Sequence, residues 1–576
     1  MNEGPNALLL AVIGVGIMVA GYFLYSKYLA KKVFKLNAEF KTPAHAFNDG
    51  TDYVPTNRFV LWGHHFTSVA GAAPIVGPAI AVIWGWLPAF LWVVFGTVLF
   101  AGMHDLGSVW ASARNKGQSL GSLSGRYIGP RGRNLFLVVI FFLLMMVIAA
   151  FATITADLLV ASPTAVIPTW GALIVAVFVG QAMYRYNWNL PIVTVVGVTA
   201  LCVLVPLGDR FPLAIPEGVL GLPATTWWII ILFVYGAVAS LLPVWVLMQP
   251  RDYINGLQLF IGLGLLYASF VIATPTVVAP AINNSVPADT PSLMPLLFVT
   301  IACGAISGFH GTVSSGTTAK QIDRETDGRF VGYFGAVGEG LLALGAILVT
   351  TAGFRTLAEW EEIYSSFENG GVEVFVQAGG TLVNQGLGLP ESLSATILAT
   401  MAVLFAATTM DTAVRLQRYV VQEIAEVFNL KIGMYTATAI SVGVCIALTF
   451  SAGADGSGGV LIWPLFGTTN QLLAALTLGI VVVMLMRKGR PFLPALIPMV
   501  FVLFVSMFAL ILQVGQFYNE GNWLLFGLDI IILVAAVWVM LEAILAMVRT
   551  KKLDPEPEDE QLLTEDEKLP VGTPRR

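Results

Sequence analysis

The sequence predicts an all-α membrane protein that crosses the bilayer many times. Hydrophobic residues make up 57% of the 576 residues and charged residues only 11%, which leaves too little polar surface to cover a water-soluble globule. Apolar stretches of about 20 residues, the length that spans the hydrocarbon core, recur along the chain. Two of them contain polar or proline-rich runs, at 63–74 and 241–250. Breaks of this kind survive in a membrane only where protein or a solvated cavity satisfies the freed backbone, so the pattern is typical of a transporter.

We count about fifteen spans of that length. No basic residue precedes the first span and its positive charges follow it, so we interpret it as an anchoring helix rather than a cleaved signal peptide. The approximate limits are 6–29, 59–83, 86–112, 134–161, 166–184, 190–206, 225–248, 255–281, 293–316, 330–355, 393–414, 432–452, 460–486, 491–514 and 523–547.

Basic residues gather in every second loop between these spans, whereas the long loop at 356–392 is rich in glutamate. Lysine and arginine accumulate in short cytoplasmic loops. We therefore predict that the N-terminus lies outside and the C-terminus in the cytoplasm. The net charge of −5 is concentrated after Lys552, and we predict that the last segment, 549–576, is a disordered acidic tail.

The two breaks predict a leucine-transporter-like arrangement of two inverted repeats of five helices. Under the charge rule the span 59–83 runs outward and the span 225–248 runs inward, and opposed broken helices at corresponding positions point to a binding site between inverted repeats. The span 293–316 also runs inward and is a competing partner for the first break. The predicted parts are an anchoring helix and loop at 1–57, repeats at 58–206 and 225–418, C-terminal helices at 432–548, and the tail.

Several long runs resemble the signature of the carbon starvation protein A family. They extend over most of the chain between residues 40 and 480, which makes chance similarity a poor explanation. The runs are Asn48 to Arg58, Gly63 to Phe66, Gly71 to Pro78, His310 to Gln321, Met410 to Thr412, and Trp463 to Ala475.

The resemblance implies a bacterial inner-membrane importer that takes up pyruvate or small peptides when preferred carbon sources run out. It also implies a fold like that of the leucine transporter and the amino acid–polyamine–organocation superfamily.

We predict that residues at the two breaks, 63–74 and 241–250, form the substrate site. Exposed backbone and the N-terminus of a half-helix attract a carboxylate, although small residues also serve close helix packing. The predicted substrate-binding residues are His64, His65, Ser68, Ala70, Gly71, Ala72 and Ala73 at the first break, and Ser240, Pro243 and Gln249 at the second.

Hydroxyl side chains follow His310 in a dense run, at Thr312, Ser314, Ser315, Thr317 and Thr318. In the leucine-transporter fold, hydroxyls on the eighth helix and carbonyls of the first form a sodium site, so the resemblance implies sodium coupling through this run. The alternative is that these hydroxyls bond back to their own helix.

Ionisable residues inside spans predict proton coupling, because they are costly there and mark relays. His310 and Glu339 are the predicted proton-coupling residues, and His64, His65 and His104 are further histidines at membrane depth. The alternatives are histidines satisfied by freed backbone, or a zinc site. We expect Asp411 to pair with Arg415 one turn away, and Asn470 and Gln471 to hold helices together.

We therefore predict an ion-coupled secondary active importer that works by alternating access and has no enzymatic activity. No glycine-rich phosphate loop followed by Lys-Ser or Lys-Thr occurs, so an ion gradient, of protons or else of sodium, is the expected energy source and no cofactor is expected. The expected partners are a small-molecule substrate and lipid, without nucleic acid. A sodium-coupled peptide symporter, a channel or sensor without coupled transport, and a membrane enzyme with a metal on its histidines are the alternatives.

Overall fold

The computed structural model describes residues 4–555, and within them the chain is all-helical, as the composition predicts. Twelve helices are long and apolar enough to cross a membrane, and a bent pair adds a thirteenth span. The described residues therefore form a multi-pass membrane protein. The predicted tail falls largely at 556–576, outside the described residues.

The helices follow the predicted apolar stretches, but two of the fifteen predicted spans are wrong: 293–316 is divided between two short helices, and 432–452 forms a helix of only 16 residues. In chain order they are α1 (Ala7–Ala20), α2 (Ser26–Tyr28), α3 (Pro43–Ala46), α4 (Arg58–Val69), α5 (Ala73–Ala81), α6 (Trp86–Phe95), α7 (Gly102–Ala113), α8 (Leu120–Tyr127), α9 (Pro130–Ala161), α10 (Val166–Gly180), α11 (Leu190–Arg210), α12 (Ala224–Leu241), α13 (Met248–Ala273), α14 (Leu293–Thr300), α15 (Gly308–Val313), α16 (Ala319–Gln321), α17 (Phe334–Ala352), α18 (Leu357–Ile363), α19 (Val372–Leu387), α20 (Glu391–Val427), α21 (Met434–Thr449), α22 (Gly458–Leu461), α23 (Trp463–Arg487), α24 (Leu493–Asn519) and α25 (Trp523–Thr550).

The first predicted break is present. The helices α4 and α5 together make one span that bends by 46° across residues 70–72. Pro74 lies in the first turn of α5, where a missing backbone N–H costs nothing. The sequence Ala-Gly-Ala-Ala-Pro therefore ends one helix and starts the next.

The second predicted break, at 241–250, is wrong. Residues 242–247 connect two separate spans, α12 and α13, instead of interrupting one. Pro250 was interpreted as interrupting a span, but it lies in the first turn of α13, where proline is tolerated. The competing span 293–316 is the interrupted one, since α14 ends at Thr300 and α15 begins at Gly308. That the segments 58–206 and 225–418 are inverted repeats stays a prediction.

The predicted loop at 356–392 also contains structure. It holds α18 and the longer α19, whose valine, phenylalanine and leucine side chains are buried on one face against α13 and α20. A stripe of apolar residues at helical spacing explains this helix.

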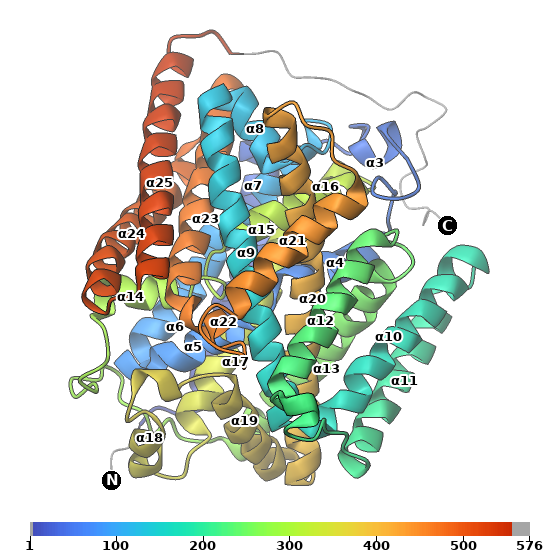
Figure 1. The fold of residues 1–576 in the computed structure, drawn as a ribbon, viewed down its shortest axis with the longest axis vertical. Coiled ribbons are helices and arrows are strands. Elements are labelled where there is room, and N and C mark those ends of the chain that lie inside the picture. The colour runs from blue at the N-terminus through green and yellow to red at the C-terminus, as the bar shows by residue number, and fades with distance from the viewer. Residues whose placement is uncertain (1–3, 556–576) are drawn as a thin grey trace.

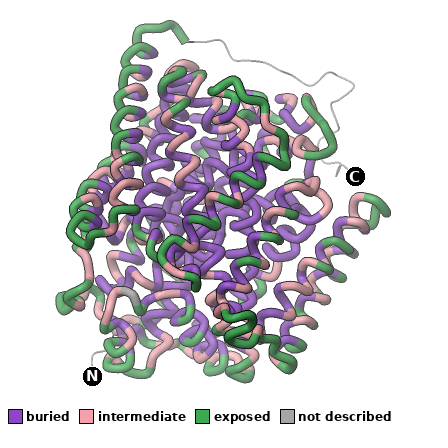
Figure 2. Tube along the Cα trace, viewed as in Figure 1, coloured by how far each residue is buried: buried purple, intermediate pink, exposed green. Residues whose placement is uncertain are grey.

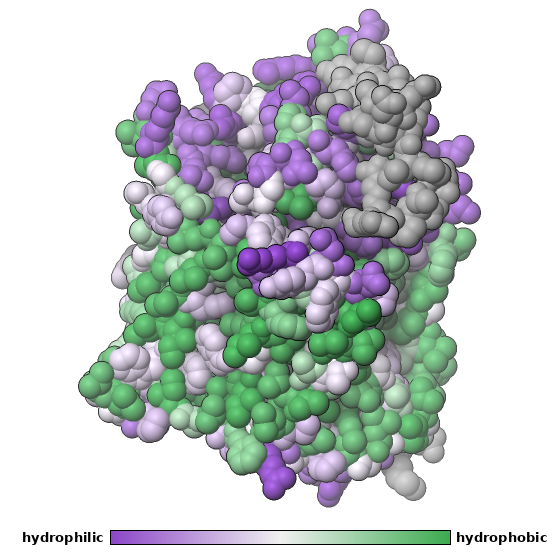
Figure 3. All heavy atoms as spheres, turned by 90° about the vertical axis from the view of Figure 1, so that its right-hand side faces the viewer, coloured by the Kyte–Doolittle hydropathy of each residue, from purple (hydrophilic) through white to green (hydrophobic). Residues whose placement is uncertain are grey.

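The molecule has a helical core and a lipid-like surface. The most apolar stretch of α23 is 94% buried and that of α20 83%, whereas that of α11 is only 22% buried. In Figure 1, α10 and α11 accordingly form a hairpin at one side, and Figure 2 shows the burial concentrated in the middle. A broad hydrophobic zone covers the face in Figure 3, with hydrophilic atoms gathered toward one end. This is the surface expected of helices that contact lipid.

A carboxylate in the C-terminal hairpin has no hydrogen-bond partner among the described residues. Asp529 of α25 is fully buried, and both of its oxygens are unpaired. Gln513 of α24 is 1% exposed and equally unpaired.

Removing the unpaired buried charge of Asp529 is expected to stabilise the folded protein. We expect Asp529→Asn to stabilise the protein by about 1 to 3 kcal/mol, measured as a rise in unfolding temperature in detergent. Glu520→Gln, at an exposed carboxylate, is the control, and an unchanged or lower temperature for Asp529→Asn contradicts the prediction.

Candidate ion and substrate site

Two adjacent histidines on α4 are fully buried and contact different partners. His64 Nδ1 lies 2.6 Å from Asp252 Oδ2 of α13, and His65 Nδ1 lies 2.9 Å from Thr318 Oγ1. Neighbouring residues on a helix point in directions about 100° apart. The pair therefore joins α4 to two separate polar clusters.

The first cluster, here called the arginine cluster, consists of His64, Asp252, Arg251, Asp411 and Tyr235. Arg251 Nε donates to Asp252 Oδ1 at 2.8 Å, and its terminal nitrogens bind Asp411 and the Tyr235 hydroxyl. Tyr235 also donates to Asp411 Oδ2 at 2.6 Å. Two carboxylates face one guanidinium here, so a proton on His64 would bring the buried charge to zero.

This arrangement corrects the expected pairing of Asp411 with Arg415. Asp411 pairs with Arg251 on another helix, while Arg415 binds Asp52 at 3.2 Å and the carbonyl of Leu242. The Tyr419 hydroxyl also donates to Asp52 at 2.8 Å. Asp52 belongs to the signature run at 48–58, which therefore fastens the segment before α4 to α20.

That segment is organised by Asp49. Burial raises the pKa of the Asp49 carboxyl, but hydrogen bonds from the backbone N–H groups of Thr51, Tyr53 and Asp52 outweigh it, so the pKa lies below its usual range. The carboxylate is thus ionised at neutral pH and holds the turn that presents Asp52.

The second cluster, here called the histidine–carboxylate chain, consists of His104, Asp105, His310 and Glu339. Asp105 Oδ1 lies 2.8 Å from His104 Nδ1, and Asp105 Oδ2 lies 2.8 Å from His310 Nδ1. His310 Nε2 in turn lies 3.0 Å from Glu339 Oε2. All four side chains are at most 1% exposed, and they come from α7, α15 and α17.

The chain can hold and exchange protons. His310 lies between two carboxylates: Nδ1 is within hydrogen-bond distance of Asp105, and Nε2 lies 3.0 Å from Glu339 at ion-pair distance but without a hydrogen bond. Glu339 Oε1 has no hydrogen-bond partner in the described structure. No group of three or more histidine, cysteine or acidic side chains within residues 4–555 is placed to hold a metal ion. The geometry suits proton transfer rather than zinc binding.

Asp105 is a member of the histidine–carboxylate chain that was not predicted from the sequence. The available signal was an acidic residue beside His104 inside the span 86–112. Only the structure brings it to His310, which is 205 residues away in the chain.

The hydroxyl run after His310 is buried, and most of it bonds to its own helix. Thr312 donates to the carbonyl of Phe309 at 2.6 Å, and Thr317 to that of Val313 at 3.1 Å. Thr318 instead meets His65. The hydroxyl of Ser314 has no partner among the described residues, and that of Ser315 has only a long contact of 3.4 Å, to the carbonyl of Thr312.

The first break is lined by α9 and α20. Thr409 donates to the carbonyl of Ser68 at 3.0 Å, and the hydroxyls of Ser68 and Thr412 lie 3.2 Å apart. A Cβ on Gly71 would lie 2.5 Å from the Phe151 ring, so only glycine fits there. The predicted residues Ala70, Ala72 and Ala73 are buried beside it. Thr409 and Thr412 were missed because α20 lies far along the chain.

The interruption between α14 and α15, at residues 301–307, is held by α23. Asn470 Oδ1 accepts from the backbone N–H of Phe309 at 2.8 Å, and its Nδ2 donates to Ser307 Oγ at 3.0 Å. Gln471 donates to the carbonyl of Phe298 at 2.6 Å. These amides thus hold helices together, as expected, by satisfying backbone that the interruption frees.

We expect Asn470→Ala to lower stability by about 1 to 3 kcal/mol, because it leaves buried backbone unpaired. The measurement is the unfolding temperature in detergent. Thr468→Ala is the matched control, since the Thr468 hydroxyl bonds only to its own helix, at Pro464. Equal losses in the two variants would contradict the assigned role.

The residues predicted at the second repeat lie elsewhere. Gln249 donates to Thr56 at 3.0 Å and to Gln321 at 2.5 Å. It therefore contacts the segment before α4, whereas the break at residues 70–72 follows the C-terminal end of α4. The Ser240 hydroxyl bonds back to Ala237, and Pro243 lies in the connection after α12. The structure does not bring these three residues to Ala70–Ala73.

Comparison with known proteins places the chain among transporters. The sequence model of the family described as carbon starvation protein CstA matches residues 6–357 and 349–509. The chain is 32% identical to the peptide transporter CstA of Campylobacter jejuni, over 90% of this chain and 82% of that protein. It is 30% identical to the pyruvate/proton symporter BtsT of Escherichia coli, over 91% of this chain and 85% of that protein. A solved mutant of the manganese transporter of Eremococcus coleocola aligns with a TM-score of 0.47 at 10% identity, over 87% of this chain and 99% of that chain.

Proposed function

The chain belongs to the carbon starvation protein CstA family, and from this premise we propose that it is a proton-coupled secondary active importer of pyruvate or short peptides. It works by alternating access, without enzymatic activity and without a cofactor. Its place is the bacterial inner membrane, with the N-terminus outside and the C-terminus in the cytoplasm.

The observation that carries this proposal is the histidine–carboxylate chain. Four titratable side chains are buried in mutual contact, and intramembrane groups of this kind form proton relays in pumps and transporters. His310 belongs to α15, which begins directly after the interruption at residues 301–307, so a change of charge at His310 acts on the interrupted segment directly.

Charge compensation supplies the coupling. With both carboxylates ionised and one imidazole protonated, the histidine–carboxylate chain carries one net negative charge in a buried site. One further proton makes the cluster neutral. The free-energy cost of closing the protein around a neutral cluster is lower than around a charged one. Protonation of Glu339 also replaces its ion pair with His310 by a hydrogen bond, which changes the contact between α15 and α17.

Uptake of labelled pyruvate into proteoliposomes tests the function. An inward proton gradient without sodium is expected to drive accumulation, and a protonophore is expected to abolish it. Labelled dipeptide in the same vesicles separates the two substrates. A failure of both substrates to accumulate, in vesicles that hold folded protein, rejects proton-coupled import. Equilibration without accumulation would instead indicate a channel or sensor.

Sodium coupling is the second candidate. It is favoured by the hydroxyls of Thr409 and Thr412 beside the carbonyl of Ser68 at the first break, because hydroxyl and carbonyl oxygens bind such an ion. Uptake driven by sodium at equal internal and external pH would support this candidate. The run from Thr312 to Thr318 supports it less, since most of these hydroxyls already have partners.

A further inference from the structure

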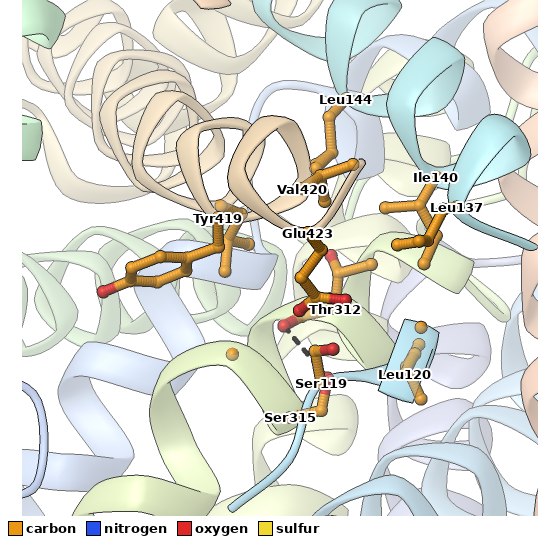
Figure 4. Close-up of a pocket in the computed structure, with 13 residues that line it drawn as sticks. Ser119, Leu120, Leu137, Ile140, Leu144, Thr312, Ser315, Tyr419, Val420 and Glu423 are labelled. Carbon is orange, nitrogen blue, oxygen red and sulfur yellow. Dashed lines mark hydrogen bonds between the residues drawn. The ribbon is translucent and has the colours of Figure 1, made fainter. Parts of the chain in front are cut away.

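A small cavity lies between α8, α9, α15 and α20, apart from the two clusters described above. Its volume is about 30 Å³, room for about two water-sized occupants. The apolar wall comes largely from α9, and the polar side chains Glu423, Ser119, Thr312 and Ser315 meet at one edge (Figure 4). These four residues are here called the Glu423 site.

Glu423 is an incompletely satisfied carboxylate. Its Oε2 is buried and has no hydrogen-bond partner in the described structure, while Ser119 contributes a side-chain hydrogen bond to the carboxylate. Arg133 and Lys320 attract the carboxylate from a distance, and neither forms an ion pair with it among the described contacts. The ammonium of Lys320 lies instead 4.6 Å from the Tyr419 ring centre. A buried carboxylate oxygen without a partner is costly, so a positive ligand there is favourable.

The backbone leaves room for this carboxylate. A Cβ on Gly121 would lie 2.8 Å from Glu423 Oε2 and 2.5 Å from Leu137 Cδ2, so the position beside the oxygen is open only because residue 121 is glycine. On the opposite side, a Cβ on Gly316 would collide with Leu416.

The available ligands are all oxygens. They are one carboxylate and the hydroxyls of Ser119, Thr312 and Ser315, and Ser315 makes only one long contact, of 3.4 Å, to the carbonyl of Thr312. Hard cations prefer such oxygen sets, whereas soft metals need sulfur or imidazole. One carboxylate neutralises a single positive charge, and the volume fits one small ion with a water.

We propose that the Glu423 site binds one sodium ion. The ion would join α20 to the segment that follows α15, and the inference does not rest on the direction or substrate of transport.

Binding is tested on purified protein in detergent without substrate. Increasing NaCl, with choline chloride holding the ionic strength constant, is expected to raise the unfolding temperature saturably in wild type. Glu423→Gln is expected to weaken the apparent sodium affinity about tenfold or more, the loss for removing a charged ligand. Glu426→Gln, at an exposed carboxylate one turn further on the same helix, is expected to leave the response unchanged.

A second variant and a second measurement protect the test against misfolding. Ser315→Ala keeps the charge and is expected to weaken sodium affinity less than Glu423→Gln, and equilibrium binding of ²²Na⁺ gives a readout independent of stability. The proposal is overturned if wild type shows no saturable sodium response at constant ionic strength, or if Glu423→Gln responds equally. Stabilisation by low pH alone, without a sodium effect, would also overturn it and assign the carboxylate to a proton. Loss of transport in the uptake assay would leave this binding result standing.

Discussion

Glu339→Gln is expected to abolish accumulation of substrate against a gradient. The amide has the size of the carboxyl group but cannot take up or release a proton, so the histidine–carboxylate chain loses its terminal acceptor. We expect concentrative uptake to fall by about 100-fold or more, the loss usual when a positioned proton-transfer group is removed. Proteoliposome uptake under an inward proton gradient measures it.

Exchange separates a coupling defect from a binding defect. Exchange of internal for external substrate needs no net proton release, so Glu339→Gln is expected to retain it. Glu361→Gln, at an exposed glutamate of α18, is the matched control and should transport normally. Wild-type accumulation in Glu339→Gln would remove Glu339 from the coupling mechanism.

Arg251→Met is expected to have the largest effect on stability. It leaves Asp252 and Asp411 buried with only His64 to compensate them. Removing one partner of a buried ion pair costs about 3 to 5 kcal/mol, because the remaining charge is unpaired. The unfolding temperature and the yield of monodisperse protein measure this loss.

A second substitution is expected to restore part of the stability that Arg251→Met loses. In Arg251→Met with Asp411→Asn, the remaining carboxylate, Asp252, keeps its contact with His64, so the double variant is expected to be more stable than Arg251→Met alone. Arg210→Met, at an exposed arginine, controls for the loss of a positive charge. A double variant no better than the single one would show that Arg251 acts through packing instead of charge.

Local features of this protein can be predicted from its sequence, whereas the pairing of distant residues cannot. Most of the spans and the break at residues 70–72 follow from apolar length and a proline placed after small residues, and these are confirmed, whereas 293–316 and 432–452 do not form full spans. The break at 241–250 is wrong because a proline in the first turn of a helix looks, in sequence, like a proline that interrupts one. Helix α19 was missed because the glutamates of 356–373, of which Glu373 lies in α19 and the others precede it, made the segment look like a loop.

Composition and the repeated apolar stretches alone define a polytopic helical membrane protein, and histidines and a glutamate inside spans already mark a titratable core. Only the tertiary structure decides which groups meet: Asp105 with His310, and Asp411 with Arg251 in place of Arg415. The reason is physical. The cost of burying a charge depends on the residue alone and can be read along the chain, whereas the partner that offsets it is chosen by how distant helices pack.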